Sequence, residues 1–131
     1  MKKALILSVL LAMASPAMAG DTSPGALIEA YSAQSGSAPV PENGKALFLG
    51  KHTGGKPDTP SCSTCHTNDP RKGGQARTGK PIDPMAPSVN PNRFTDTKFV
   101  EKWFRRNCKS VLGRECSAQE KADIIAWLSS L

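Results

Sequence analysis

Cys62-Ser63-Thr64-Cys65-His66 is the stretch that decides the fold of this chain. It has the form C-x-x-C-H, in which two thiols are separated by two residues and followed at once by a histidine. This spacing suits covalent haem attachment, because two thioether bonds to the haem vinyl groups leave the histidine placed to ligate the iron. The motif therefore predicts one c-type haem, held through Cys62 and Cys65 and ligated by His66.

Other interpretations of the motif fit its surroundings less well. A thioredoxin-like redox pair belongs in a β-α-β setting, whereas glycine- and proline-rich loops flank this motif. A zinc site would need a second pair of ligands, and the other two cysteines are poorly spaced for that role. A structural disulfide would not account for the adjacent histidine.

The first 19 residues predict an export signal. Two lysines precede an apolar run over 4–14, and a small-residue cleavage site ends at Ala19. The run is shorter than the roughly 20 residues that span a bilayer. We therefore expect a signal peptide over 1–19, a monohaem domain over 20–131 without a membrane span, and a periplasmic location.

The composition indicates a small domain that depends on a cofactor. Only 5% of the 131 residues are aromatic, and glycine and proline number 11 each, so the chain buries a modest core. The formal charge is +6, and loss of the two leader lysines leaves about +4. That charge is too small and dispersed to argue for nucleic acid, and it indicates an acidic redox partner only weakly.

Four helices and no sheet are predicted, because the chain has helical apolar spacing but neither a period-2 pattern nor a repeat. The 67–92 segment, with five prolines and three glycines, should be mostly irregular. The first expected helix begins at Pro24 with Ser23 as its N-cap, and the second begins at Asn43, which is its expected N-cap. The third and fourth expected helices cover 95–107 and 117–130, and the fourth starts with a Ser117–Glu120 capping box.

The order of these elements resembles a class I cytochrome c, an all-α fold in which helices enclose one haem. A more specific resemblance covers essentially the whole mature chain, and the motifs that carry it lie downstream of the haem motif. It is to the family of the sphaeroides haem protein (SHP), a periplasmic monohaem cytochrome. The motifs that carry it are Gly79-Lys80, Ala86-Pro87-Ser88, Asn92-Arg93-Phe94-Thr95-Asp96, Val100-Glu101-Lys102-Trp103, Arg106-Asn107-Cys108, Gly113-Arg114, Cys116 and Glu120-Lys121.

The resemblance implies several site roles. Asn107 would be the sixth iron ligand of the oxidised haem, and Cys108 and Cys116 would form a disulfide. The reduced haem would bind O2, NO or CO. The electron donor would be a dihaem cytochrome c.

The residues alone leave the sixth ligand open. Met85 precedes the third helix, whereas the methionine ligand of an ordinary class I cytochrome follows it, so Met85 more simply packs as an apolar residue. His52 lies in a Gly/Pro loop, where a solvated histidine is the commoner outcome. Asn107 shares a helix face with Phe99 and Trp103, but asparagine also suits a helix C-cap, and both roles are about equally supported.

The expected function is uptake of one electron, followed by binding of O2 or NO at the position that Asn107 vacates. A plain electron carrier without ligand exchange and a haem enzyme that reduces peroxide, NO or O2 are the alternatives, so enzymatic turnover is left open. Arg77, Thr78 and Lys80 are candidate partners of the haem propionates. Solvated surface charges are an equally good interpretation of these three residues.

Overall fold

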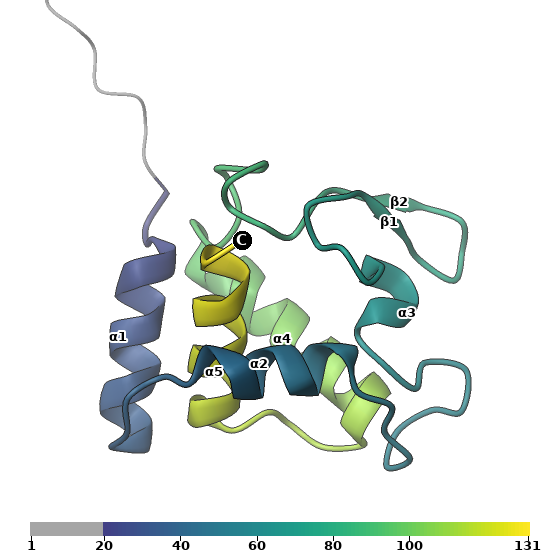
Figure 1. The fold of residues 1–131 in the computed structure, drawn as a ribbon, viewed down its shortest axis with the longest axis horizontal. Helices are drawn as coiled ribbons and strands as arrows, with labels where there is room; N and C mark the ends of the chain where they lie inside the picture. Colours follow the sequence, from purple (N-terminus) through teal and green to yellow (C-terminus); the bar gives the residue numbers. More distant parts are fainter. Residues whose placement is uncertain (1–19) are drawn as a thin grey trace, which may run out of the picture.

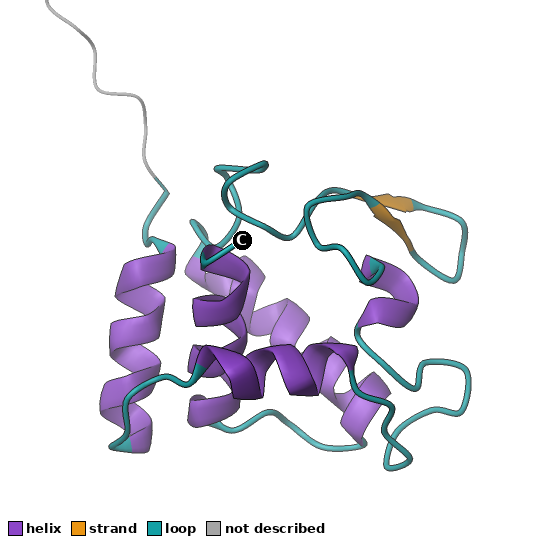
Figure 2. Cartoon of the chain, viewed as in Figure 1, coloured by secondary structure: helices purple, strands orange, loops and turns teal. Residues whose placement is uncertain are grey.

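The computed structural model describes residues 20–131, so the predicted signal peptide lies outside the described residues. The described part is helical, with one very short hairpin (Figures 1 and 2). No helix within it is long and apolar enough to cross a membrane. Its elements are α1 (Pro24–Ser35), α2 (Pro41–Leu49), α3 (Ser63–His66), β1 (Gly74–Gln75), β2 (Pro81–Ile82), α4 (Thr97–Leu112) and α5 (Ala118–Ser129).

Helix α5 forms the centre of the core, and α1 and α2 pack against it (Figure 1). Ile125 and Leu128 of α5 are completely buried, as the apolar spacing of this helix predicts. Its N-terminus has the expected capping box, in which Ser117 and Glu120 satisfy each other's backbone N–H groups. Ser23 caps α1 as expected, accepting from Ala26 N at 3.2 Å.

The crossing of α2 over α5 depends on Gly44. A Cβ atom at this position would clash with the carbonyl group of Asp123 and with the backbone nitrogen of Ile124. The Asp123 side chain is also buried here, and it accepts hydrogen bonds from the backbone nitrogen of Val40 and from Nε2 of Gln119, both at 2.7 Å. The two helix backbones are therefore in direct contact at this point.

We expect Gly44→Ala to lower the free energy of unfolding by about 3 kcal/mol, because a methyl group must push the two helices apart. Gly25→Ala in α1 is the matched control, since a Cβ there meets nothing within 4 Å. The control should be neutral or stabilise the protein by up to about 1 kcal/mol. Urea unfolding of both variants measures the difference, and equal midpoints would contradict the close crossing.

Helix α2 begins earlier than the sequence indicates. The expectation that Asn43 caps this helix is wrong, because the helix starts at Pro41. Proline has a backbone angle that suits the first helical position, and the extended residue Val40 precedes it.

Helix α4 begins later and ends later than expected. Its N-cap is Asp96, whose carboxylate accepts from Phe99 N at 2.8 Å. It ends at Leu112, and Gly113 caps it with a left-handed φ of 73°. Asn107 therefore lies inside the helix, and the helix C-cap interpretation of this residue is wrong.

Helix α4 is joined to α1 and α5 by a polar cluster of Tyr31, Glu101 and Lys121. The Tyr31 hydroxyl and Lys121 Nζ both donate to the Glu101 carboxylate, the second at 2.9 Å. Lys121 also lies over the rings of Tyr31 and Phe104, 5.1 and 5.8 Å from their centroids. Burial, together with Glu101, raises the pKa of Tyr31 above its ordinary value. The cluster turns the Glu101 charge towards the core side of α4.

The 67–92 segment is mostly irregular, as predicted, but it also contains a hairpin that the sequence did not indicate. Gly74 pairs with Ile82 and Gln75 with Pro81 in antiparallel register. Gly79 occupies the turn with a φ of 85°. A Cβ at Gly74 would clash with the carbonyl oxygen of Cys65, so the hairpin lies directly against α3.

Candidate functional site

The C-x-x-C-H motif forms the short helix α3 and the residue before it. His66 N donates to Cys62 O at 3.1 Å, so the chain turns helically through the motif and sets the two cysteine side chains on one side. Ser61 anchors this turn, because its hydroxyl donates to Phe48 O at 3.0 Å and accepts from Ser63 N at 3.2 Å. The end of α2 thereby fixes the position of the motif.

Both cysteines of the motif are half-buried, and neither takes part in a disulfide. Burial raises the pKa of the Cys62 thiol to about 11. A neutral, half-buried sulfur is compatible with a thioether bond, which carries no charge.

The His66 ring is held in a largely apolar environment. It lies 5.8 Å from the ring of Phe48, which in turn packs 5.2 Å from Trp127. Burial and the positive charge of Arg93 lower the pKa of His66 to about 4. The imidazole is therefore neutral near pH 7, which is the form that binds metals.

The side chains present fit a covalently held haem. His66 Nδ1 is buried and has no hydrogen-bond partner within residues 20–131, an expensive arrangement in an ordinary core. No described residue engages the imidazole by a hydrogen bond, so its other ring nitrogen, Nε2, remains available to bind a metal. Phe99 and Trp103 are 49% and 37% exposed, and they offer the apolar surface that a macrocycle covers. Two free thiols next to this histidine complete the set of groups.

Asn107 lies on α4 together with these two aromatic residues. Phe99, Trp103 and Asn107 are spaced by four residues, so they share one side of the helix, and the two rings are 6.0 Å apart. Asn107 is half-buried, and its amide makes no hydrogen bond to any described residue. The amide is therefore not engaged by the protein itself, and its role as an iron ligand stays a prediction.

The other two candidate ligands have structural roles. Met85 packs against the hydrophobic core, as its apolar interpretation predicts. His52 is half-buried and its Nε2 lies 2.9 Å from Leu47 O at the end of α2. The expectation of a solvated His52 is therefore wrong, because this carbonyl group engages the ring.

The three candidate propionate partners lie together in the exposed loop between β1 and β2. Arg77 already forms an ion pair with Asp58. Thr78 and Lys80 are exposed. Since the hairpin rests on α3, all three belong to the neighbourhood of the haem motif, and their contact with propionates stays a prediction.

Arg93 is a site residue that the sequence reasoning missed. It is half-buried, and its guanidinium donates to Asp83 O at 2.6 Å and to Pro84 O at 2.8 Å. Phe94, the next residue, is buried with a left-handed φ of 62°, which non-glycine residues rarely adopt. Arg93 lies in an irregular segment, where no sequence periodicity indicates which side chains are buried. The only sequence signal for it was its place in the 92–96 motif of the family resemblance.

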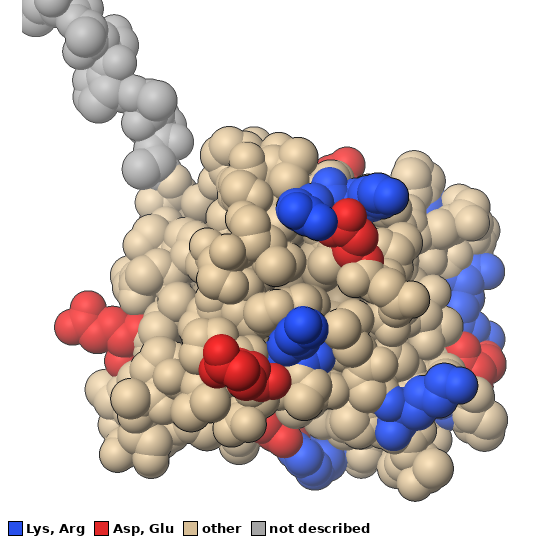
Figure 3. Space-filling model, viewed as in Figure 1, with Lys and Arg blue, Asp and Glu red and all other residues tan. Residues whose placement is uncertain are grey.

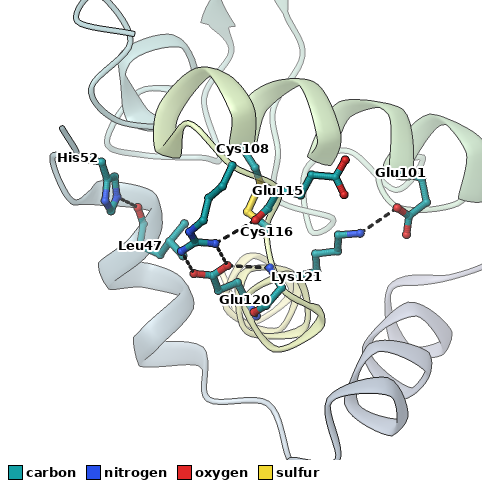
Figure 4. Close-up of a disulfide and its surroundings, with 10 residues drawn as sticks. Leu47, His52, Glu101, Cys108, Glu115, Cys116, Glu120 and Lys121 are labelled. Atoms are coloured by element: carbon teal, nitrogen blue, oxygen red, sulfur yellow. Dashed lines mark hydrogen bonds and ion pairs between the residues drawn. A yellow bond between two sulfur atoms is a disulfide. The ribbon is translucent and has the colours of Figure 1, made fainter. Parts of the chain in front are cut away.

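Cys108 and Cys116 form the disulfide that the family resemblance implies (Figure 4). Both are buried, with Cα atoms 5.6 Å apart. Cys108 lies inside α4, so the disulfide does not mark the helix end. It ties the last turns of α4 to the loop before α5, where Arg114 donates to both Glu120 carboxylate oxygens at 2.8 and 2.7 Å.

We expect Cys108→Ser combined with Cys116→Ser to lower the free energy of unfolding by about 2.5 kcal/mol, since the bond closes a short loop in the unfolded chain. The same change should loosen the placement of Asn107, one residue before Cys108. Urea unfolding with and without reductant measures the loss, and reductant should affect only the wild type. Alkylation of two thiols at these positions in the native protein would contradict the bond.

Comparison with known proteins identifies a family model and relatives of this chain. A family model described as a domain of unknown function, DUF1924, matches residues 34–128. Over 130 residues the chain is 58% identical to cytochrome c-type protein SHP of Cereibacter sphaeroides, with 99% of each chain covered. It is 44% identical over 92 residues to cytochrome c'' of Methylophilus methylotrophus, which covers 70% of this chain and 64% of that protein.

Solved structures give the same relatives. Oxidised SHP, described as an oxygen-binding cytochrome c, superposes with a TM-score of 0.83 at 58% identity and covers 86% of this chain and 100% of its own. Oxidised cytochrome c'' of Methylophilus methylotrophus superposes with a TM-score of 0.69 at 38% identity, covering 82% and 93%. A solution structure of cytochrome c'', described as giving insight into haem-ligand detachment, has a TM-score of 0.68.

Proposed function

The chain belongs to the DUF1924 family and is a c-type cytochrome with covalently bound haem c, and on that premise we propose that it takes up one electron and then binds a diatomic gas. Cys62 and Cys65 would hold the haem, and His66 would ligate its iron in both oxidation states. When bound, this group would supply an iron that changes oxidation state by one electron and can bind a diatomic gas.

The position of Asn107 is the observation that carries the proposal. Its side chain starts on the side of α4 that carries Phe99 and Trp103, and its amide has no hydrogen-bond partner within residues 20–131. An amide oxygen is a hard, weak donor, which suits ferric iron and binds softer ferrous iron poorly. Asn107 would therefore ligate in the oxidised protein and leave on reduction. Its freed NH2 group can then donate a hydrogen bond to a bound gas.

The relatives support this role. SHP is described as an oxygen-binding cytochrome c, and cytochrome c'' is described in terms of haem-ligand detachment. Gas binding after loss of a ligand combines these two properties in one chain. O2 and NO are the proposed ligands, and CO is a convenient probe.

The proposed location is the periplasm and the proposed electron donor is a dihaem cytochrome c. The export pattern of residues 1–19 supports the first. The family resemblance supports the second. Haem attachment after export agrees with this location, because c-type haem is added outside the bacterial cytoplasm.

Optical spectra of the holoprotein in both redox states test the proposal. We expect the ferrous protein to be high-spin and to shift on addition of CO or NO. An unresponsive, six-coordinate ferrous spectrum would favour the plain electron carrier instead. Steady-state consumption of peroxide, NO or O2 would favour a turnover enzyme.

A further inference from the structure

The net positive charge of the described chain resides on a single helix. Residues 20–131 contain 15 of the 17 lysines and arginines and all 11 aspartates and glutamates. Helix α4 holds five of these cations and one carboxylate. The rest of the described chain holds ten cationic side chains and ten carboxylates, so its net charge is zero. The sequence total made the charge look dispersed, but the fold concentrates it.

The five cations lie along one stripe on one side of α4, because they are spaced by three and four residues. All five side chains are exposed. We call this stripe the α4 basic face. Glu101 offsets this charge only near Arg105, with which it forms no ion pair, since its carboxylate is engaged by Tyr31 and Lys121. The residues of the α4 basic face are Lys98, Lys102, Arg105, Arg106 and Lys109.

Only weak internal pairing reduces this charge. Glu115 lies 3.9 Å from Arg105 and 3.8 Å from Lys109, and its side chain is 61% exposed, so water and salt screen both contacts. Outside α4 a cation can be paired more closely: Arg71 donates to both carboxylate oxygens of Asp69. The molecular face in Figure 3, opposite the more distant α4 of Figure 1, shows positive and negative side chains intermixed.

The α4 basic face borders the candidate site directly. The cations of Arg106 and Lys102 lie 5.1 and 5.7 Å from the ring centroid of Trp103. Trp103 is one turn before Asn107 on the same helix. A molecule docked on these cations would therefore lie one side chain away from the residue proposed to ligate iron.

We propose that the α4 basic face is the docking surface for an acidic electron-donor protein. This inference rests on the electron uptake in the proposed function. Complementary charge raises the rate of encounter and orients a partner for a short-lived contact, which is what electron transfer needs.

A protein fits this surface better than a membrane. A membrane-bound helix needs an apolar face free to enter the lipid. On α4, Val100 and Val111 are buried in the protein, and Phe99 and Trp103 belong to the candidate haem site. The face that is left offers charge without an apolar side to insert.

The test compares two triple variants with the same net charge. One carries Lys98→Gln, Lys102→Gln and Lys109→Gln on the α4 basic face. The matched control carries Lys45→Gln, Lys56→Gln and Lys72→Gln, three exposed lysines elsewhere. Stopped-flow measurement gives the rate at which reduced flavodoxin, an acidic one-electron donor protein, reduces each ferric holoprotein. Dithionite serves as a small reductant that needs no docking surface.

At low salt the α4 variant should be reduced by flavodoxin about tenfold more slowly than the wild type, and the control variant should stay within about twofold. The difference should vanish in 0.5 M NaCl, at which ionic strength charges more than roughly 4 Å apart are screened. Dithionite should reduce the two charge-matched variants equally, and all three proteins equally in 0.5 M NaCl, which shows that the variants are folded and loaded.

Equal slowing of both triple variants would overturn the proposal, because net charge alone would then explain the rate. An unchanged α4 variant would overturn it as well. Selective loss of binding to phosphatidylserine vesicles, with an unchanged flavodoxin rate, would assign the α4 basic face to a membrane. CO spectra of the same samples test gas binding separately, so failure of that part of the proposed function is visible independently of docking.

Discussion

Replacing Cys62 and Cys65 together with alanine is expected to abolish covalent retention of the haem. Both sulfurs lie outside the disulfide and are half-buried, at the start of α3 and one residue before His66. Thioether bonds at these sulfurs are the only covalent link that the motif offers. Acid-acetone extraction of denatured protein and intact mass measurement give the readout. The wild type should keep its haem and the mass of one haem group, and the double variant should lose both.

The double variant Cys108→Ser and Cys116→Ser is the matched control for this loss. It removes the same number of sulfurs, but at the disulfide rather than at the motif. It should unfold more easily and still keep its haem through extraction. Free extraction of haem from the wild type, or covalent haem in the double alanine variant, would refute attachment through Cys62 and Cys65.

Local signals predicted much of the fold. Ser23 before Pro24, and Ser117 before Glu120, gave the starts of α1 and α5 correctly, because a cap is decided by a few neighbouring residues. The C-x-x-C-H motif is equally local, since its chemistry depends on spacing alone. The disulfide pairing followed from the family resemblance and is present in the structure.

Features that depend on contacts distant in the sequence were not predictable in the same way. The role of Gly44 appears only when α5 is placed against it, and the half-buried Arg93 depends on carbonyl groups ten and nine residues earlier. The hairpin at Gly74 has two-residue strands, too short for a period-2 pattern to show. The C-cap alternative for Asn107 was wrong, because helical propensity alone does not show that α4 continues to Leu112.

Asn107→Ala is expected to leave the ferric haem high-spin or water-ligated. Removing the amide opens the iron to added ligands, so azide and cyanide should bind roughly tenfold more tightly or better, because no internal group competes for the position. Asn43→Ala is the control, an exposed asparagine on α2, and its azide affinity should match the wild type. Optical titration of the ferric proteins with azide measures both.

Asn107→Met should reverse the selectivity between oxidation states. Thioether sulfur is a softer donor than an amide oxygen and stays bound to ferrous iron, so the variant should have a six-coordinate, low-spin ferrous spectrum, a raised reduction potential and poor CO binding. The side chain starts from the middle of α4, one turn after Trp103, where methionine is a good helix former. A variant that still binds CO as the wild type does would show that CO does not bind at the position proposed for Asn107. A wild-type ferrous protein that is already six-coordinate and low-spin would mean that Asn107, or whichever ligand is present, never leaves, and electron transfer alone would then be the function of this chain.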